Sequence, residues 1–348
     1  MGLRRTPFAS DPDPEAPGTM VNGVQKTVSA SRSVAMKFAF TILKLSITAS
    51  LCYWLFSRID VESLRINLQQ LGAFPIIAGV LLHFVVFMVG AFRWWMLLTH
   101  THTATPFHRV LPSYYLGVFF NNLLPTGIGG DTVRILHLRV RGISTKSLVS
   151  STVMDRVIGL STVAIMGLCG VLIPNELRIQ NHTKAVLITI FVIGLLSAGV
   201  MMSNHSVRFI ETLAQKYRHT RVRVWLLDMI LTCYTYRTTK SRIALAYIAS
   251  IIGQSLITLV YYILGRGLGL DLSIATYFVA IPAVFLAASL PVSIGGLGIR
   301  EGTLVGMLVA AGANLQLAIN LSLAYLLVLW ISASPGALVL LFNRSEKK

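Results

Sequence analysis

The chain has 348 residues, of which 54% are hydrophobic and only 12% are charged. A soluble domain carries about 25% charged residues, so this composition excludes an ordinary soluble protein and predicts an all-α integral membrane protein. The net charge of +17 would suggest nucleic-acid binding in a soluble chain. Here most Lys and Arg lie in loops between apolar runs, where they set orientation and contact anionic headgroups. No nucleic-acid partner is expected.

The chain is predicted to have one polytopic membrane domain, residues 35–342, between two polar tails. Residues 1–34 are rich in Pro, Asp, Ser and Arg and are predicted to be a disordered cytoplasmic tail, and residues 343–348 form a second cytoplasmic tail. The first apolar run begins late and is not followed by a small-residue cleavage site, so a signal peptide is not expected.

Apolar runs long enough to cross a bilayer occur six times, since a span needs about 20 such residues. They are 36–57, 73–98, 151–174, 184–203, 241–265 and 317–341. Two more apolar regions, 107–138 and 274–311, are interrupted by a repeated motif. Leu124–Arg134 (LPTGIGGDTVR) returns at Leu290–Arg300 (LPVSIGGLGIR), with six of eleven positions identical. Pro and paired Gly oppose a continuous helix, so each region is predicted to be a broken segment.

Basic loops alternate with charge-balanced loops along the chain, which fits six full crossings with both termini inside. Each broken segment then starts and ends on one side, so each is predicted to be a re-entrant helical hairpin. The offset of 166 residues between the motifs also maps span 73–98 onto span 241–265. The fold is therefore predicted to contain an inverted repeat, with repeat A at about 73–174 and repeat B at about 241–341. Such repeats place a transport site near the bilayer midplane.

A basic segment, 204–240, joins the two repeats. Its residues 222–236 combine apolar positions with flanking arginines, which is typical of an interfacial helix. A positive-inside loop without lipid specificity explains the same pattern.

The first motif has the composition of an anion site. Its glycines allow the chain to reverse, Asp131 can cap the limb that follows, and Arg134 lies one turn further on. A helix N-terminus beside an arginine suits an anionic oxygen group such as phosphate. The alternative is that Asp131 only caps the helix and pairs with Arg134.

The second motif has Leu297 where the first has Asp131, and its acid is Glu301 beside Arg300. An arginine in hydrocarbon costs at least about 3 kcal/mol unless it is paired or hydrated. The simplest pairing crosses between the repeats, with Arg134 near Glu301 and Arg300 near Asp131.

Asp155 and Arg156 begin the span 151–174. Neighbouring helix positions point about 100° apart, so one of the two is expected to face the first hairpin; an interfacial pair is the alternative. His83, inside a span, either relays protons or packs against a Tyr or a backbone carbonyl. Arg93, Trp94 and Trp95 are typical of an interfacial anchor, and Tyr261 and Tyr262 of an aromatic belt.

Catalytic and cofactor signatures were not found: there is no Walker loop, nucleophile elbow or metalloprotease motif. His100, His102 and His108 could bind a metal, but loop histidines without acids or cysteines are usually solvated. Cys52, Cys169 and Cys233 give no metal or disulfide pattern. We expect no cofactor and no ATP-driven step on this chain.

The two motifs, together with the acid–Arg pair Asp155–Arg156, resemble the lysylphosphatidylglycerol synthase transmembrane family, whose members are also described as flippase-like domains. The resemblance covers about residues 36–342. In that family the acid–Arg pair is often Glu-Arg. Its long members carry a soluble aminoacyl-transfer domain after the spans, whereas this sequence ends at Lys348. The resemblance therefore implies the lipid-translocating part and not lipid synthesis.

The leading hypothesis is a lipid translocator of a bacterial-type cytoplasmic membrane, which moves an anionic or phosphate-bearing lipid between leaflets; a homodimer is one of its candidate assemblies. The alternatives are an integral membrane enzyme or accessory subunit that acts on lipid-linked phosphate or glycan headgroups, and a scaffold for such enzymes. The residues predicted to bind the headgroup are Asn121, Asn122, Pro125, Gly129, Gly130, Asp131, Arg134, Asp155 and Arg156 in repeat A, and Pro291, Gly295, Gly296, Arg300 and Glu301 in repeat B.

Overall fold

The computed structural model describes residues 46, 49, 50, 53, 57, 61–101, 105–124, 129–174, 177, 181–201, 236, 240–289 and 296–342. The chain divides into the units Met1–Ser46 and Ile47–Lys348, and all that follows concerns the second unit. The span predicted at 36–57 and the basic segment 204–240 lie almost wholly outside the described residues, as do both tails.

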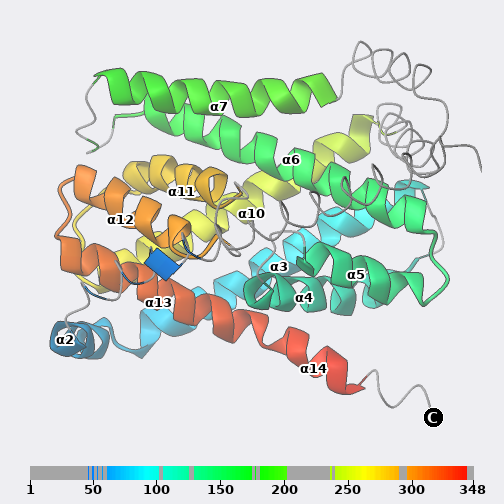
Figure 1. Cartoon of the computed structure of the whole chain (residues 1–348), viewed down its shortest axis with the longest axis horizontal. Coiled ribbons are helices and arrows are strands. Elements are labelled where there is room, and N and C mark those ends of the chain that lie inside the picture. Colours follow the sequence, from blue (N-terminus) through cyan, green and yellow to red (C-terminus); the bar gives the residue numbers. More distant parts are fainter. Residues whose placement is uncertain are drawn as a thin grey trace, which may run out of the picture. The chain divides into compact units, whose positions relative to one another are not determined.

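Every regular element in the described part of the chain is a helix (Figure 1). The helices are α2 (Val61–Leu71), α3 (Ala73–Thr101), α4 (Phe107–Leu123), α5 (Gly129–Arg139), α6 (Thr145–Leu172), α7 (Asn181–Met201), α10 (Lys240–Gly267), α11 (Ile274–Ser289), α12 (Ile299–Ala310), α13 (Leu315–Ala333) and α14 (Pro335–Phe342).

Four stretches are long and apolar enough to cross a membrane: Ala73–Thr99, Thr145–Leu172, Lys240–Gly267 and the α13–α14 stretch Leu315–Leu340. They confirm the helices predicted at 73–98, 151–174, 241–265 and 317–341. The run predicted at 184–203 is also helical, within α7, but its apolar part Lys184–Leu196 is shorter.

Helix α6 begins at Thr145, before its apolar run starts at 151. Its N-cap, Ser144, precedes a polar first turn that hydropathy does not detect. Ser144 accepts a hydrogen bond from the backbone N–H of Ser147 (3.3 Å), an N-cap. Gly142 has φ +88°, which suits the turn between α5 and α6. The helix therefore starts with polar residues before the span predicted at 151.

Both interrupted regions are pairs of short helices, α4 with α5 and α11 with α12, and each pair is packed together. In each region the break falls at the repeated motif. Figure 1 shows that α4 begins and α5 ends at the end of the molecule where α6 begins. Helix α11 begins and α12 ends at the opposite end. The element order of long helix, short pair and long helix thus occurs twice, in opposite directions.

Helices of the two halves pack against one another throughout the second unit. The most extensive helix packing joins α3 of the first half to α10 of the second, while α11 packs on α6 and α4 packs on α14. A Cβ atom on Gly170 of α6 would lie 2.6 Å from the Phe278 carbonyl oxygen of α11. A Cβ on Gly336 of α14 would lie 2.3 Å from the Tyr115 carbonyl oxygen of α4. Each long segment therefore uses a glycine to approach the short pair of the other half.

Candidate ionic site at the first helix pair

The paired glycines of the first motif bring α5 against α4. Gly129 and Gly130 begin α5, and the Gly130 N–H donates to Asn121 Oδ1 at 3.1 Å. A Cβ on Gly130 would lie 2.0 Å from the Gly117 carbonyl oxygen, so only glycine fits this contact. Asp131 and Arg134 follow within the first turns of α5, and both are buried.

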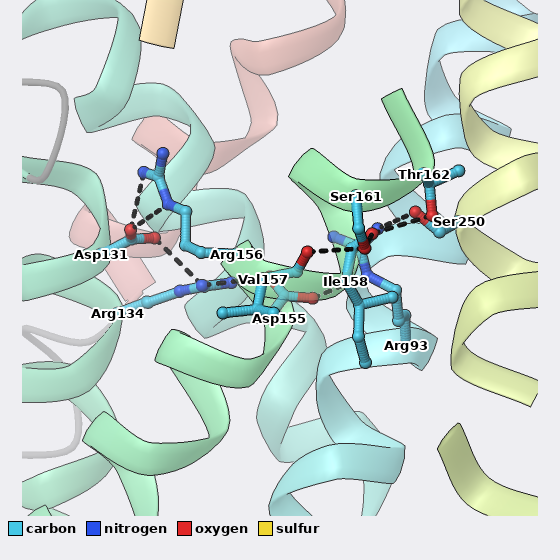
Figure 2. Close-up of polar contacts among 10 residues, drawn as sticks. All are labelled: Arg93, Asp131, Arg134, Asp155, Arg156, Val157, Ile158, Ser161, Thr162 and Ser250. Atoms are coloured by element: carbon cyan, nitrogen blue, oxygen red, sulfur yellow. Dashed lines mark hydrogen bonds and ion pairs between the residues drawn. The ribbon is translucent and has the colours of Figure 1, made fainter. Parts of the chain in front are cut away.

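Arg134 lies between two carboxylates. Its Nη2 atom is 3.0 Å from Asp131 Oδ1 on its own helix and 3.3 Å from Asp155 Oδ2 on α6 (Figure 2). The expected pair of Asp131 with Arg134 is therefore present, but it is part of a larger cluster. One guanidinium group joins α5 to α6.

Two further arginines extend the cluster in opposite directions. Arg93 of α3 donates from Nε to Asp155 Oδ1 at 2.7 Å and from Nη1 to Ser250 Oγ of α10 at 2.8 Å. Arg156 of α6 donates from Nε to Asp131 Oδ2 at 2.8 Å. Figure 2 shows the resulting row of polar contacts, from Arg156 through Asp131, Arg134, Asp155 and Arg93 to Ser250. The row links three helices of the first half to α10 of the second.

Aromatic rings cover the centre of this cluster. The guanidinium carbon of Arg134 lies 4.3 Å from the ring centroid of Trp94, which is fully buried, and 5.5 Å from that of Tyr114. A guanidinium group over an aromatic face is attracted by the ring quadrupole. Arg134 Nε is buried without a hydrogen-bond partner in the described structure. One donor at the centre of the cluster therefore remains unused.

The cluster has an excess of positive charge. Among the described residues it contains three guanidinium groups, from Arg93, Arg134 and Arg156, and two carboxylates, from Asp131 and Asp155, which is one more positive charge than negative charges. Four of these side chains are mostly buried, whereas the Arg156 side chain is 43% exposed. The four buried side chains carry two positive and two negative charges, so Arg156 at the exposed edge is where an additional anion would be accommodated.

Asp155 and Arg156 both contact the first helix pair, whereas only one of them was expected to do so. Asp155 meets Arg134 and Arg156 meets Asp131, both on α5. The two side chains leave α6 in different directions, but α5 passes close enough for its acid and its arginine to meet one each. Asn122 is turned away from the cluster, since its Nδ2 donates to the Val118 carbonyl oxygen at 3.0 Å. Pro125 lies outside the described residues.

The second motif forms a separate ion pair. Arg300 donates from Nε and Nη2 to Glu301 Oε1 at 2.9 and 2.7 Å, and Glu301 Oε2 accepts from the Gly298 N–H at 2.7 Å. The expected pairing of Arg134 with Glu301 and of Arg300 with Asp131 is therefore wrong. Each motif satisfies its arginine within its own half, because a partner is available one to three residues away.

The structure describes some of the remaining residues of the second motif. Gly296 has φ +77° and is buried, as the turn before α12 requires. Pro291 and Gly295 lie outside the described residues. The predicted headgroup contacts at this motif stay a prediction.

Aromatic side chains lie near the second motif. Tyr261 of α10 and Tyr325 of α13 are stacked with ring centroids 3.8 Å apart, and His83 of α3 contacts Tyr325 edge to face at 5.5 Å. Tyr261 is buried, so its assignment to an interfacial belt is wrong. The packing alternative for His83 matches the structure, although its Nδ1 has no partner among the described residues.

Sequence reasoning missed Arg93, Trp94 and Ser250. Arg93 and Trp94 were assigned to an interfacial anchor, but Trp94 is fully buried and Arg93 pairs with Asp155. The available signal was position: Arg93 stands 20 residues after Ala73, within one continuous apolar helix. A charge at such a depth favours a functional or paired role.

Metal ligands are not grouped in the described residues, where no three His, Cys, Asp or Glu side chains could hold one ion. His102 lies outside them. The expectation that the protein uses no cofactor stays a prediction.

Comparison with known proteins assigns the chain to a family. The sequence model of the family described as "Lysylphosphatidylglycerol synthase TM region" matches residues 41–336. The chain is a multi-pass membrane protein, and it belongs to this family. It is also 22% identical, over 295 residues, to a UPF0104 membrane protein of Pyrococcus horikoshii; the match covers 77% of this chain and 87% of that protein.

Proposed function

We propose that this protein is a lipid translocator, and not an enzyme, that moves an anionic, phosphate-bearing lipid between the leaflets of a cytoplasmic membrane. The observation that carries the proposal is the ionic cluster of repeat A, in which three arginines meet two carboxylates and Arg134 Nε has no hydrogen-bond partner among the described residues. A lipid phosphodiester has a negative charge and acceptor oxygens, which suit the N–H donors of guanidinium groups. Membership of the family supports a role that concerns lipids.

The proposed topology has six crossings with both termini in the cytoplasm and with the α4–α5 and α11–α12 pairs as re-entrant hairpins. The opposite directions of the two pairs support this arrangement, since each break then comes at depth in the bilayer. Broken helices at such a depth are tolerated only where they are buried or line a wet cavity. Hairpins of this kind mark substrate sites in transporters built from inverted repeats.

Arg134 is the proposed centre of headgroup binding. Its guanidinium group already bridges two carboxylates, and a fork of N–H donors also suits phosphate oxygens. A phosphate that engages Arg134 and Arg156 would compete with Asp131 for both arginines. The headgroup would therefore weaken contacts that hold α5 to α6 while its acyl chains remain in lipid.

Leaflet exchange in proteoliposomes tests the proposal. We expect the purified protein to accelerate exchange of fluorescent phosphatidylglycerol, measured by quenching of the outer leaflet. Arg156→Ala removes an exposed edge of the cluster, and Arg134→Lys keeps the charge but loses the fork; each should slow exchange about tenfold or more. The matched control is Arg65→Ala, which breaks the exposed Glu62–Arg65 pair on α2 and should leave exchange unchanged.

Other outcomes would contradict the proposal. An enzyme would convert the labelled lipid to a new product in detergent, and the same variants would abolish that conversion. A scaffold would show neither exchange nor conversion. Equal exchange by wild-type protein and both cluster variants would also exclude the ionic cluster as the headgroup site.

A further inference from the structure

A second basic site lies at the end of the molecule where α6 begins. His108 and Arg109 of the first turn of α4, together with Pro112 and Arg141, line an open pocket of about 430 Å³. Arg141 follows α5 in a turn in which its N–H donates to the Leu138 carbonyl oxygen at 3.1 Å. None of the four described lining residues is acidic. The pocket therefore combines two guanidinium groups and an imidazole from separate elements.

Charge is distributed unevenly between the two ends of the bundle. At the pocket end, the helix termini of the described chain carry basic residues and no acid: Arg109, Arg139, Arg141, Lys146, Lys240 and Arg242. At the opposite end, Arg65 pairs with Glu62 and Arg266 pairs with Asp271. An excess of Lys and Arg marks the cytoplasmic side, where anionic lipid headgroups concentrate.

Aromatic side chains place the pocket at the depth of the headgroups. Phe107, next to His108, packs against Trp95 with ring centroids 5.8 Å apart, and Phe92 completes this aromatic group. Trp95 Nε1 donates to the Thr105 carbonyl oxygen at 2.9 Å. Aromatic rings with a polar tip gather at the membrane–water interface. The pocket opens beside this group.

Helix α5 lies between the ionic cluster and the turn that contains the pocket residue Arg141. Arg134 and His137 are three residues apart, the spacing of neighbours on one helical face, and Arg141 follows in the turn after α5. His137 Nδ1 is 2.6 Å from Ser113 Oγ of α4. The pocket therefore lies at the C-terminal end of α5, and Arg134 of the ionic cluster lies nearer the start of the same helix.

We propose that the pocket formed by His108, Arg109 and Arg141 binds the phosphate group of an anionic phospholipid from the cytoplasmic leaflet. The two guanidinium groups supply fork donors and charge, and the pocket volume is that of a small-ligand site. The site binds lipid through its own residues, so the proposal does not depend on whether the ionic cluster translocates the headgroup.

Photo-crosslinking in nanodiscs tests this site directly. The full-length protein is reconstituted in phosphatidylcholine with a photoreactive phosphatidylglycerol, and crosslinked peptides are mapped by mass spectrometry. Crosslinks should concentrate in 105–112 and 139–143. The double variant Arg109→Ala/Arg141→Ala should lower them about tenfold, since each basic contact adds to binding. The double variant to Lys retains charge and should keep most of the signal. Arg139→Ala, which removes a single charge at the same end but outside the pocket, should change the signal less than twofold.

Three results would overturn the proposal. A photoreactive phosphatidylcholine could label the same peptides equally, the double alanine variant could retain full labelling, or inorganic phosphate could abolish labelling and so identify a site for free phosphate. Failure here differs from failure of the translocation proposal, because leaflet exchange is measured in a separate assay with the cluster variants.

Discussion

Arg134 shows how a guanidinium group is retained in an apolar helix bundle. Asp131 neutralises it from the same helix, Asp155 from α6, and Trp94 covers its face. Each carboxylate accepts from a second arginine as well. Arg93, Arg134, Asp131 and Asp155 each have at least two polar or aromatic neighbours, so the loss of one member leaves a buried charge without a partner, at a large desolvation cost.

Asp155 is the member on which stability should depend most. Asp155→Ala leaves Arg93 and Arg134 without their shared carboxylate, so we expect a loss of about 3–5 kcal/mol in the free energy of unfolding. The measurement is reversible denaturation in detergent micelles. Glu62→Gln, which disrupts an exposed pair, serves as the control and should leave the unfolding midpoint in place.

The double variant Arg93→Met/Asp155→Leu separates pairing from packing. Both charges are then replaced by apolar side chains, and most of the lost stability should return. A double variant as unstable as Asp155→Ala alone would mean that the helix contacts, and not the buried charge, determine the loss.

Much of this cluster could be predicted from the sequence, because Asp131, Arg134, Asp155 and Arg156 stand at a motif or at the start of a span. Their partners could not be predicted. Arg134 and Glu301 were expected to meet across the repeats, but partner choice depends on how α5 lies against α6. Ser250 gave no signal at all, since serine is common in apolar helices and its contact with Arg93 depends on the packing of α3 on α10.

At the scale of elements, the contact between α4 and α5 depends on two glycines that face each other. A Cβ on Gly117 would lie 2.9 Å from the Gly130 carbonyl oxygen, and a Cβ on Gly130 would lie 2.0 Å from the Gly117 carbonyl oxygen. Both obstacles are backbone atoms, so a new methyl group cannot be accommodated by rotation of a side chain. The two helices would have to separate.

Gly130→Ala should therefore destabilise the protein by about 1–3 kcal/mol and also slow lipid exchange, because it moves Asp131 and Arg134. Gly302→Ala on α12 is the matched control, since nothing lies within 4 Å of its Cβ position. In a helix interior that change should stabilise by up to about 1 kcal/mol. Thermal unfolding of both variants checks the difference, and equal effects would show that the α4–α5 approach is not tight.

Helix boundaries were harder to predict than helix existence. The sequence placed the break in each short pair at the Pro–Gly motif, where the structure has it, because Pro and Gly act locally. It placed the start of α6 at Ser151 instead of Thr145, because the first turns are polar and a hydropathy window does not detect an N-cap.

For the whole molecule, the unequal charge of its two ends predicts its orientation. The end with Arg109 and Arg141 should face the cytoplasm and the end with Asp271 should face outward. In a background without native cysteines, Asp271→Cys should react with a membrane-impermeant maleimide in intact bacterial cells. Arg139→Cys should react only after the membrane is opened. The reverse pattern would invert the proposed topology.

The two halves share a framework but not a charge pattern. At an offset of 166 residues Arg134 corresponds to Arg300, whereas Asp131 corresponds to Leu297, Asp155 to Leu321 and Arg156 to Ser322. Only the first half therefore has the chemistry of an ionic cluster. The second half keeps one arginine and satisfies it with Glu301. We expect cluster variants of repeat A to affect lipid exchange more than Arg300→Ala does.

Gly170 and Gly336 are also 166 residues apart, and each lies against a backbone carbonyl that belongs to the other half. Each short pair therefore packs against a helix that belongs to the other half of the chain. A half-length chain could not cover its own short pair and would need a second copy inserted upside down beside it. Two separately expressed halves should accordingly be recovered from membranes only when they are made together.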